Sequence, residues 1–269
     1  MSGHCNVAVG ACAMDSNTTA SDNVAIGMSA LKSNTTGTRN VGVGYLTLND
    51  NVTGGNNVAV GFCAGKSNTG TANVAVGDSA LRLNIENDNT AVGNRALYSN
   101  TTGTPNTAIG YQSLCSNTTA SQNTAVGYQS LCGNTTGERN TALGFRSLCA
   151  NTTGSDHIGI GCGALMNNTT GEANVAVGRA TLTANTTGSC NVAIGYFALD
   201  KNTTSNANTG VGFFALACNT TGANNAAYGF KSLSANTTGG SNVAVGINAL
   251  FSNVDATQNT GVGANALYT

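Results

Sequence analysis

Residues 6–10 read Asn-Val-Ala-Val-Gly, and this short segment decides the fold because it returns along the whole chain. Thirteen of the fifteen steps between its sixteen copies are 17 residues long, and two are 16. The consensus is N-[VT]-[AG]-[VI]-G-[YF]-x-[AS]-L-x-x-N-T-T-G-x-x, with positions numbered from the opening Asn. The chain is therefore a single internal repeat. Variants of the segment begin at residues 23, 40, 57, 73, 89, 106, 123, 140, 157, 174, 191, 208, 225, 242 and 259.

The repeat has the pattern of strands and turns. Val-Ala-Val-Gly alternates large and small residues with period two, and Val, Ile and Thr favour strands. Asn-Thr-Thr-Gly is a turn signal, because Asn and Gly tolerate left-handed backbone. Repeats built from two helices need roughly 33 to 47 residues. The sequence predicts an all-β protein: a parallel β-solenoid (β-roll) of about sixteen 17-residue rungs, each with two or three short strands. We expect one repetitive domain, 1–269, without caps.

Two apolar positions are predicted to form a narrow interior. They are the fourth, which is Val, Ile or Leu in all copies but one, and the ninth, which is Leu in fourteen copies. The third position is restricted to Ala or Gly, and the fifth is always Gly. Two explanations stay open for these small residues: a corner that needs positive φ, or the close approach of another backbone. A core this thin favours support from other chains.

The Asn residues that open each repeat and those that open each turn are predicted to form two ladders, in which an amide of one rung donates to the amide oxygen of the next. Position twelve is Asn in all fifteen turns. Twelve of these turns also carry the N-x-[ST] glycosylation sequon, but glycans spaced by about 4.8 Å would crowd one another. The ladder is therefore the preferred interpretation. The twelve residues are Asn17, Asn34, Asn51, Asn100, Asn117, Asn134, Asn151, Asn168, Asn185, Asn202, Asn219 and Asn236.

Position six is aromatic in eight copies, which stacking would align into an aromatic stripe. We favour packing at a subunit interface or over a corner, and the alternative is a strip that binds carbohydrate or a surface. The paired Thr residues of the turns suggest ice binding less strongly, because adjacent side chains point in different directions. The stripe consists of Tyr45, Phe62, Tyr111, Tyr128, Phe145, Tyr196, Phe213 and Phe230.

The remaining reactive residues do not predict a catalytic or metal site. The nine cysteines are odd in number and lack a CxxC pair, although Cys115, Cys132 and Cys149 share one repeat position. They are read as small apolar fillers, since disulfide geometry along a ladder is poor. The only His residues are His4 and His157, and His157 replaces an opening Asn. We expect no enzyme activity, no cofactor and no metal.

Composition excludes several classes of protein. Charged residues are 8% of the chain and the net charge is −1, so the basic surface of a nucleic-acid binder is missing. No run approaches 18 consecutive apolar residues, which argues against membrane insertion. A hydrophobic content of 40% with almost no net charge argues against disorder. No basic and apolar signal peptide follows the first residue.

The Asn-Val-Ala-Val-Gly and Asn-Val-Ala-Ile-Gly segments resemble the head repeats of trimeric autotransporter adhesins. That resemblance covers the whole chain and implies a left-handed β-roll, a homotrimer and an extracellular or cell-surface location. The longer unit, with A-L-x-x-N-T-T-G, is similar to repeats of phage and giant-virus tail-fibre proteins and of repetitive surface proteins. A virion location is therefore also implied.

Two functions are expected from these patterns. The first is a structural fibre, built by stacking rungs and joined end to end: the five residues before Asn6 and the eleven from Asn259 onward together match the 16-residue length of the two short repeats. Open strand edges would drive this self-association. The second is an adhesin-like or tail-fibre rod that recognises glycans or a host surface.

Overall fold

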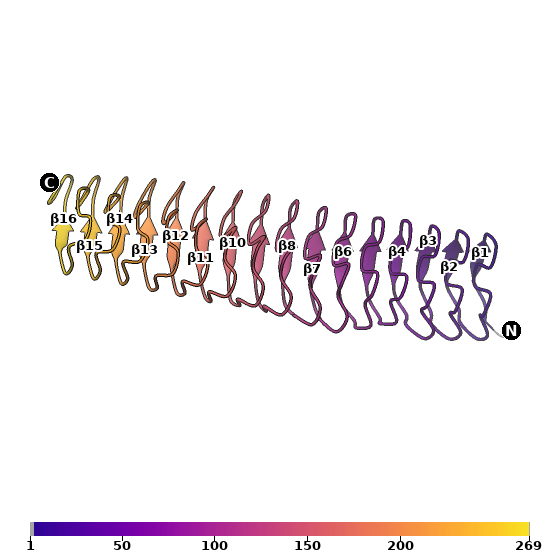
Figure 1. Cartoon of the computed structure of the whole chain (residues 1–269). Helices are drawn as coiled ribbons and strands as arrows, with labels where there is room; N and C mark the ends of the chain where they lie inside the picture. The colour runs from indigo at the N-terminus through magenta and orange to yellow at the C-terminus, as the bar shows by residue number, and fades with distance from the viewer. Residues whose placement is uncertain (1–2, 269) are drawn as a thin grey trace. The chain divides into compact units, whose positions relative to one another are not determined.

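The computed structural model describes residues 3–268 and confirms the predicted fold class, a parallel β-solenoid without helix in that range (Figure 1). The chain divides into two compact units, Met1–Thr136 and Gly137–Thr269, with the boundary inside an Asn-Thr-Thr-Gly turn. The expected single domain, 1–269, and its expected end-to-end continuation include residues 1, 2 and 269. These three lie outside the described residues.

Each repeat contributes one three-residue strand, and the strands follow one another in sequence order within each unit (Figure 1). Neighbours pair in parallel and in register, so that Val7 lies opposite Val24 and Ile158 opposite Val175. The first unit holds β1 (Val7–Val9), β2 (Val24–Ile26), β3 (Val41–Val43), β4 (Val58–Val60), β5 (Val74–Val76), β6 (Thr90–Val92), β7 (Thr107–Ile109) and β8 (Thr124–Val126). The second holds β9 (Thr141–Leu143), β10 (Ile158–Ile160), β11 (Val175–Val177), β12 (Val192–Ile194), β13 (Thr209–Val211), β14 (Ala226–Tyr228), β15 (Val243–Val245) and β16 (Thr260–Val262).

The prediction of two or three strands per rung is wrong, because the rest of each rung is a series of turns. In the second repeat the seventh and ninth residues, Ser29 and Leu31, have φ of 58° and 51°. Such left-handed residues alternate with ordinary ones and bend the chain back within a few residues. The turns still join rungs: Ser29 N–H donates to Ala11 O at 2.9 Å, and Leu31 N–H donates to Thr47 O at 2.9 Å.

The interior prediction is correct at the ninth position and wrong at the fourth. Leu31 and Ala25 are fully buried, whereas Ile26 is 41% exposed on the outer face of its strand. An alternating pattern gives a strand two faces. The small Ala or Gly at position three faces the narrow interior, and the larger residue at position four faces outward. The space inside is limited by leucine, because a Cβ on Gly159 would lie 3.1 Å from Leu148 Cδ1. At Gly159 the leucine side chain is the nearest obstacle, whereas a Cβ on Gly210 would lie 3.2 Å from the backbone oxygen of Ala215 in the same rung.

Both explanations hold for the invariant fifth glycine. Gly110 has φ of +133°, where L-residues are strained. A Cβ at this position would also lie 2.4 Å from Gly127 O of the next rung. The glycine thus permits the rung spacing as well as the turn that follows each strand.

Candidate functional site

The turn asparagines form a buried column of amides at position twelve. Asn117 Nδ2 donates to Asn100 Oδ1 at 2.7 Å and to Ala120 O of its own turn at 2.9 Å. Asn134 Nδ2 donates in turn to Asn117 Oδ1 at 3.1 Å. In the second unit the same link joins Asn185 to Asn168 at 2.8 Å. Asn117 and Asn185 therefore each close their own turn and connect it to the neighbouring rung.

The column includes three asparagines that lack the sequon and were not among the twelve predicted ladder residues. Asn84 Nδ2 donates to Asn68 Oδ1 at 2.7 Å, and Asn253 Nδ2 donates to Asn236 Oδ1 at 3.0 Å. Their constant position in the repeat is the signal that identifies them. The column is interrupted between Asn51 and Asn68, where Asn51 Oδ1 and Asn68 Nδ2 have no hydrogen-bond partner. This break falls at a repeat whose turn is one residue short.

The column asparagines that carry the glycosylation sequon are buried. Asn117, Asn151 and Asn219 are fully buried, and Asn17, in the first repeat, is 8% exposed. The Nδ2 atom, to which a glycan would be attached, lies inside the rung. Glycosylation at these residues in the folded chain would require breaking the column.

The opening asparagines form a second buried column with a different link. Asn40 N–H donates to Asn23 Oδ1 at 2.8 Å, and Asn40 Nδ2 donates to Gly54 O of the next turn at 2.8 Å. His157 takes an Asn place in this column. Its Nδ1 accepts from Asn174 N–H at 3.1 Å, and its Nε2 lies 2.7 Å from Gly171 O. This arrangement fits the neutral Nε2–H tautomer, and burial lowers the pKa of His157.

The predicted aromatic residues stack in separate groups. In the first unit Tyr45 stacks on Phe62 and Tyr111 on Tyr128, both with ring centroids 5.2 Å apart. Asp78 occupies the same repeat position between these two pairs. The rings are about half exposed. The structure therefore brings together the members of each pair but not the two pairs.

The second unit carries a larger aromatic group. Tyr196, Phe213 and Phe230 stack on consecutive rungs with centroids 5.4 Å apart. Phe197 and Phe214, at position seven, extend the group, and their rings lie 4.4 Å from Tyr196 and 4.6 Å from Phe213, respectively. Sequence reasoning missed these two, although each directly follows a stripe residue. We call these five residues the aromatic patch.

Two cations lie over rings of the aromatic stripe. Arg179 lies 5.6 Å from the Tyr196 ring centroid, and Lys231 lies 5.4 Å from that of Phe230. These distances fit cation–π contacts. Phe145, the remaining predicted member, is 51% exposed. The stacked rings cover one another's faces, so the aromatic patch presents ring edges and two cations to solvent.

The outer face of the strands is also apolar. The sequence analysis did not predict this face, because it placed position four in the interior. Position-four residues point outward, and Val9, Ile109 and Leu143 are 56%, 40% and 46% exposed. Position two, which is Val, Ile, Thr or Ala, shares this face. Each unit thus presents a band of β-branched side chains beside its aromatic residues.

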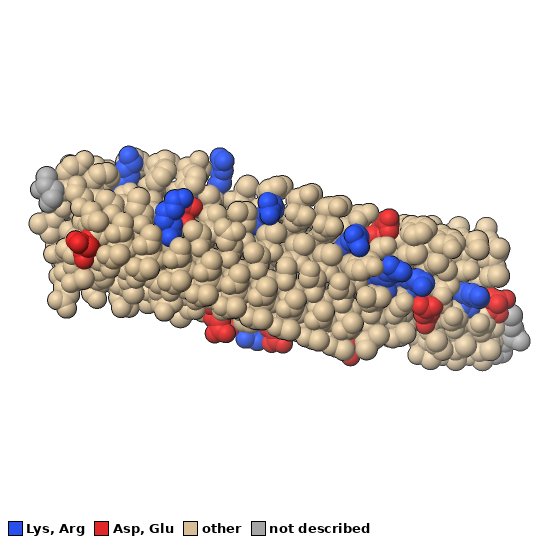
Figure 2. Space-filling model, viewed as in Figure 1, with Lys and Arg blue, Asp and Glu red and all other residues tan. Residues whose placement is uncertain are grey.

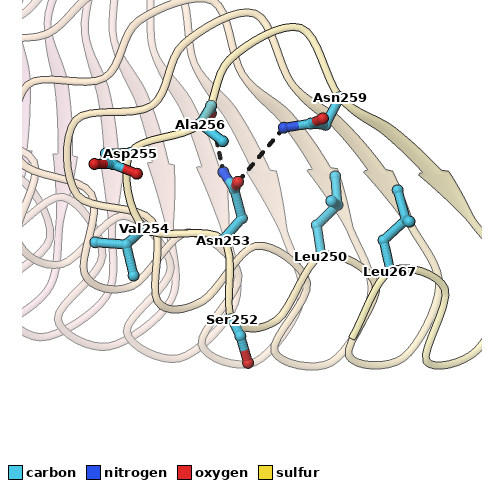
Figure 3. Close-up of a pocket in the computed structure, with 8 residues that line it drawn as sticks. All are labelled: Leu250, Ser252, Asn253, Val254, Asp255, Ala256, Asn259 and Leu267. Carbon is cyan, nitrogen blue, oxygen red and sulfur yellow. Dashed lines mark hydrogen bonds between the residues drawn. The ribbon is translucent and has the colours of Figure 1, made fainter. Parts of the chain in front are cut away.

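Hollows occur at the first and last described rungs. The C-terminal hollow, of about 410 Å³, is lined by Leu250, Leu267 and the turn around Asn253 (Figure 3). Leu250 and Leu267 project in the same direction on successive rungs, and Asn259 Nδ2 donates to Asn253 Oδ1 at 3.5 Å. Leu267 is 57% exposed, whereas Leu250 is 3% exposed. The N-terminal hollow is lined by the equivalent interior positions, including Ala8, Met14 and Asn17.

Charged side chains are few and scattered over the face seen in Figure 2. The ion pairs of Arg139 are exposed: Arg139 lies 2.9 Å from Glu138 and 2.7 Å from Asp156, and its guanidinium lowers the pKa of Asp156. Lys201 pairs at 2.9 Å with Asp200, whose side chain is largely buried. Within residues 3–268, no group of three or more His, Cys, Asp or Glu side chains is placed to hold a metal ion. In the same range no helix is long and apolar enough to cross a membrane.

Comparison of the chain with protein-family models, with curated proteins and with solved structures finds no match.

Proposed function

We propose that this chain is a structural protein, a length of fibre shaft made by stacking β-solenoid rungs. The observation that carries the proposal is the buried amide column, in which Asn117 bonds both its own turn and Asn100 of the neighbouring rung. Backbone hydrogen bonds, such as that from Val24 N–H to Asn40 O at 2.8 Å, also join neighbouring rungs. Pulling along the axis would act on many such bonds at once.

The interior suits this role, because it is filled by Ala, Leu and Asn. A fibre of this kind belongs outside the cell, at a cell surface or on a virion. Its partner is a second copy of the chain, which stacks end to end or packs laterally as a homotrimer, as in the adhesin heads that the repeat resembles.

Sedimentation velocity over a concentration series tests the self-association. The full chain is expected to form larger species as concentration rises. Leu267→Asp, which places a charge in the C-terminal hollow, should abolish growth by end-to-end stacking. Ile247→Asp is the matched control, because Ile247 is 55% exposed at position six. A monomer at every concentration would contradict the proposal, and loss of growth in the control alone would point to lateral packing.

A second function, a rod that binds glycans or a host surface, is favoured by the aromatic patch. Its five rings, with Arg179 and Lys231 beside them, offer apolar ring edges and positive charge to an acidic sugar. Binding of the full chain to a glycan array tests this function. Phe213→Ala should remove binding, whereas Tyr45→Ala, from the smaller first-unit pair, should retain it. Equal binding by both variants would contradict a role for the aromatic patch.

A further inference from the structure

Two cysteines lie next to each other on consecutive rungs of the first unit. Cys115 and Cys132 share repeat position ten, 17 residues apart, and both are half-buried. Hydrogen bonds fix their register on both sides: Leu114 N–H donates to Ser130 O at 3.0 Å, and Ser116 N–H donates to Cys132 O at 3.1 Å. Rungs held in this way place equivalent side chains about 4.8 Å apart.

The two thiols interact directly. The Cys132 thiol is hydrogen-bonded to the Cys115 sulfur, and this bond is the largest influence on the pKa of Cys115. Together with the charge of Arg95 it outweighs burial and lowers the pKa of Cys115 to about 7. Arg95 is held in place over the Tyr98 ring, 4.8 Å from its centroid. Cys115 is therefore a reactive thiol with a second thiol beside it.

The remaining cysteines of this unit are placed differently. Cys12 and Cys63 share repeat position seven but lie three rungs apart, and Cys5 occupies position seventeen. Within the described residues no third Cys, His or acidic group joins the pair to enclose a metal ion. The pair therefore offers two sulfur ligands on a rigid, preset spacing, and it suits a centre that forms two bonds to sulfur.

We propose that Cys115 and Cys132 form a dithiol site for soft thiophilic centres, of which trivalent arsenic is the simplest representative. Phenylarsine oxide would react with both thiols at once. Two S–H bonds break, two As–S bonds form, and the two protons leave with the oxide oxygen as water. Arsenic stays trivalent, so no oxidant or reductant is needed. Bridging two in-register side chains leaves the backbone ladder intact, whereas a direct disulfide demands a shorter sulfur–sulfur approach.

The test exploits the scarcity of Arg and Lys in this part of the chain. Trypsin cuts after Arg95 and Arg139, and the peptide 96–139 contains Cys115 and Cys132 as its only cysteines. The folded full chain is treated with one equivalent of phenylarsine oxide, and free thiols are then blocked with N-ethylmaleimide. After denaturation the arsenical is removed with a small dithiol, and the released thiols are labelled with heavy N-ethylmaleimide. A sample without the arsenical corrects for buried thiols.

Heavy label on both cysteines of peptide 96–139, in excess of the untreated sample, is the expected result. Cys115→Ser and Cys132→Ser should each abolish protection of the remaining partner. Cys12→Ser, from repeat position seven of the same unit, should leave protection unchanged. The peptide 1–32, with Cys5 and Cys12 as its only cysteines, should gain no label. The assignment is overturned if single variants stay protected, or if peptide 1–32 is protected equally.

Discussion

Asn117 Nδ2 lies 2.7 Å from Asn100 Oδ1 of the neighbouring rung and 2.9 Å from Ala120 O of its own turn. One buried amide therefore performs two tasks that are usually separate, closing a turn and fixing the distance between turns. Its oxygen accepts from Asn134, so the same pattern continues to the next rung.

Asn117→Ala should lower the free energy of unfolding by about 2–3 kcal/mol. The variant leaves the buried Asn100 Oδ1 without the Asn117 donor, removes one of the two donors to Ala120 O, and breaks the bond from Asn134 Nδ2. Urea denaturation measures the change. Thr119→Ala is the control, since Thr119 is exposed in the same turn, and it should shift stability by no more than about 0.5 kcal/mol. Equal effects would mean that the amide column does not stabilise the rung.

The two positive-φ glycines of the tenth repeat, Gly161 and Gly163, should respond differently to alanine. A Cβ at Gly161 would lie 2.4 Å from Gly178 O of the next rung, whereas a Cβ at Gly163 meets nothing within 4 Å. Both have positive φ, +128° and +70°. Gly163→Ala should cost roughly 1–2 kcal/mol for its backbone conformation, and Gly161→Ala clearly more, about 3 kcal/mol or above. Thermal unfolding of the two variants decides whether rung spacing limits this position.

Leu114→Ala and Ile109→Ala test which side chains form the interior. Leu114 is fully buried and Ile109 is 40% exposed on the outer strand face. Truncation of the buried leucine should cost about 2–5 kcal/mol. Loss of the isoleucine side chain should cost about 1 kcal/mol or less. The opposite order, measured by urea unfolding, would restore the inward position four that the alternating pattern suggested.

These comparisons show what the repeat pattern could and could not predict. Strand type, repeat length and the buried Leu31 follow from periodicity and composition. The orientation of Ala25 and Ile26 does not, because alternation marks two faces without saying which one fits a narrow interior. The number of strands per rung was mispredicted because the left-handed position of Leu31 is Leu in fourteen copies and Gly in one, Gly65, so its composition does not indicate a turn.

Some of the candidate site residues could be predicted from the repeat pattern, and others could not. The column of Asn117 follows from an invariant position and the stacking of rungs. The rings of Phe197 and Phe214 were missed because they occur in adjacent repeats and not in the consensus. The link between Cys115 and Cys132 depends on rotamers and on Arg95, which sequence spacing does not specify.

His157 should make the folded chain acid-sensitive. Its folded-state pKa is lowered from an ordinary 6.5, chiefly by burial, so the unfolded chain binds a proton more readily. Stability from the neutral ring is therefore complete above about pH 6.5 and declines as pH falls below it. His157→Asn, which restores the residue of the other rungs, should remove this part of the decline between pH 7 and 5. His4→Asn is the control and should leave it in place.

Cys115 should be alkylated with a pH midpoint of about 7, because the Cys132 hydrogen bond and Arg95 stabilise its thiolate. Iodoacetamide rates, followed on peptide 96–139, give this midpoint. In the Arg95→Gln variant, which lacks that trypsin site, the equivalent peptide is 83–139, and Cys115 and Cys132 are again its only cysteines. Cys132→Ser and Arg95→Gln should both move it upward. A midpoint that neither variant changes would show that these two neighbours do not activate the thiol.

Cryo-electron microscopy of the full chain over a concentration series tests the structural role most directly. The proposal predicts filaments whose length grows with concentration and whose axial layer spacing is about 4.8 Å, the distance between rungs. Leu267→Asp should shorten them. Discrete particles of constant size at every concentration would contradict assembly of a fibre by rung stacking.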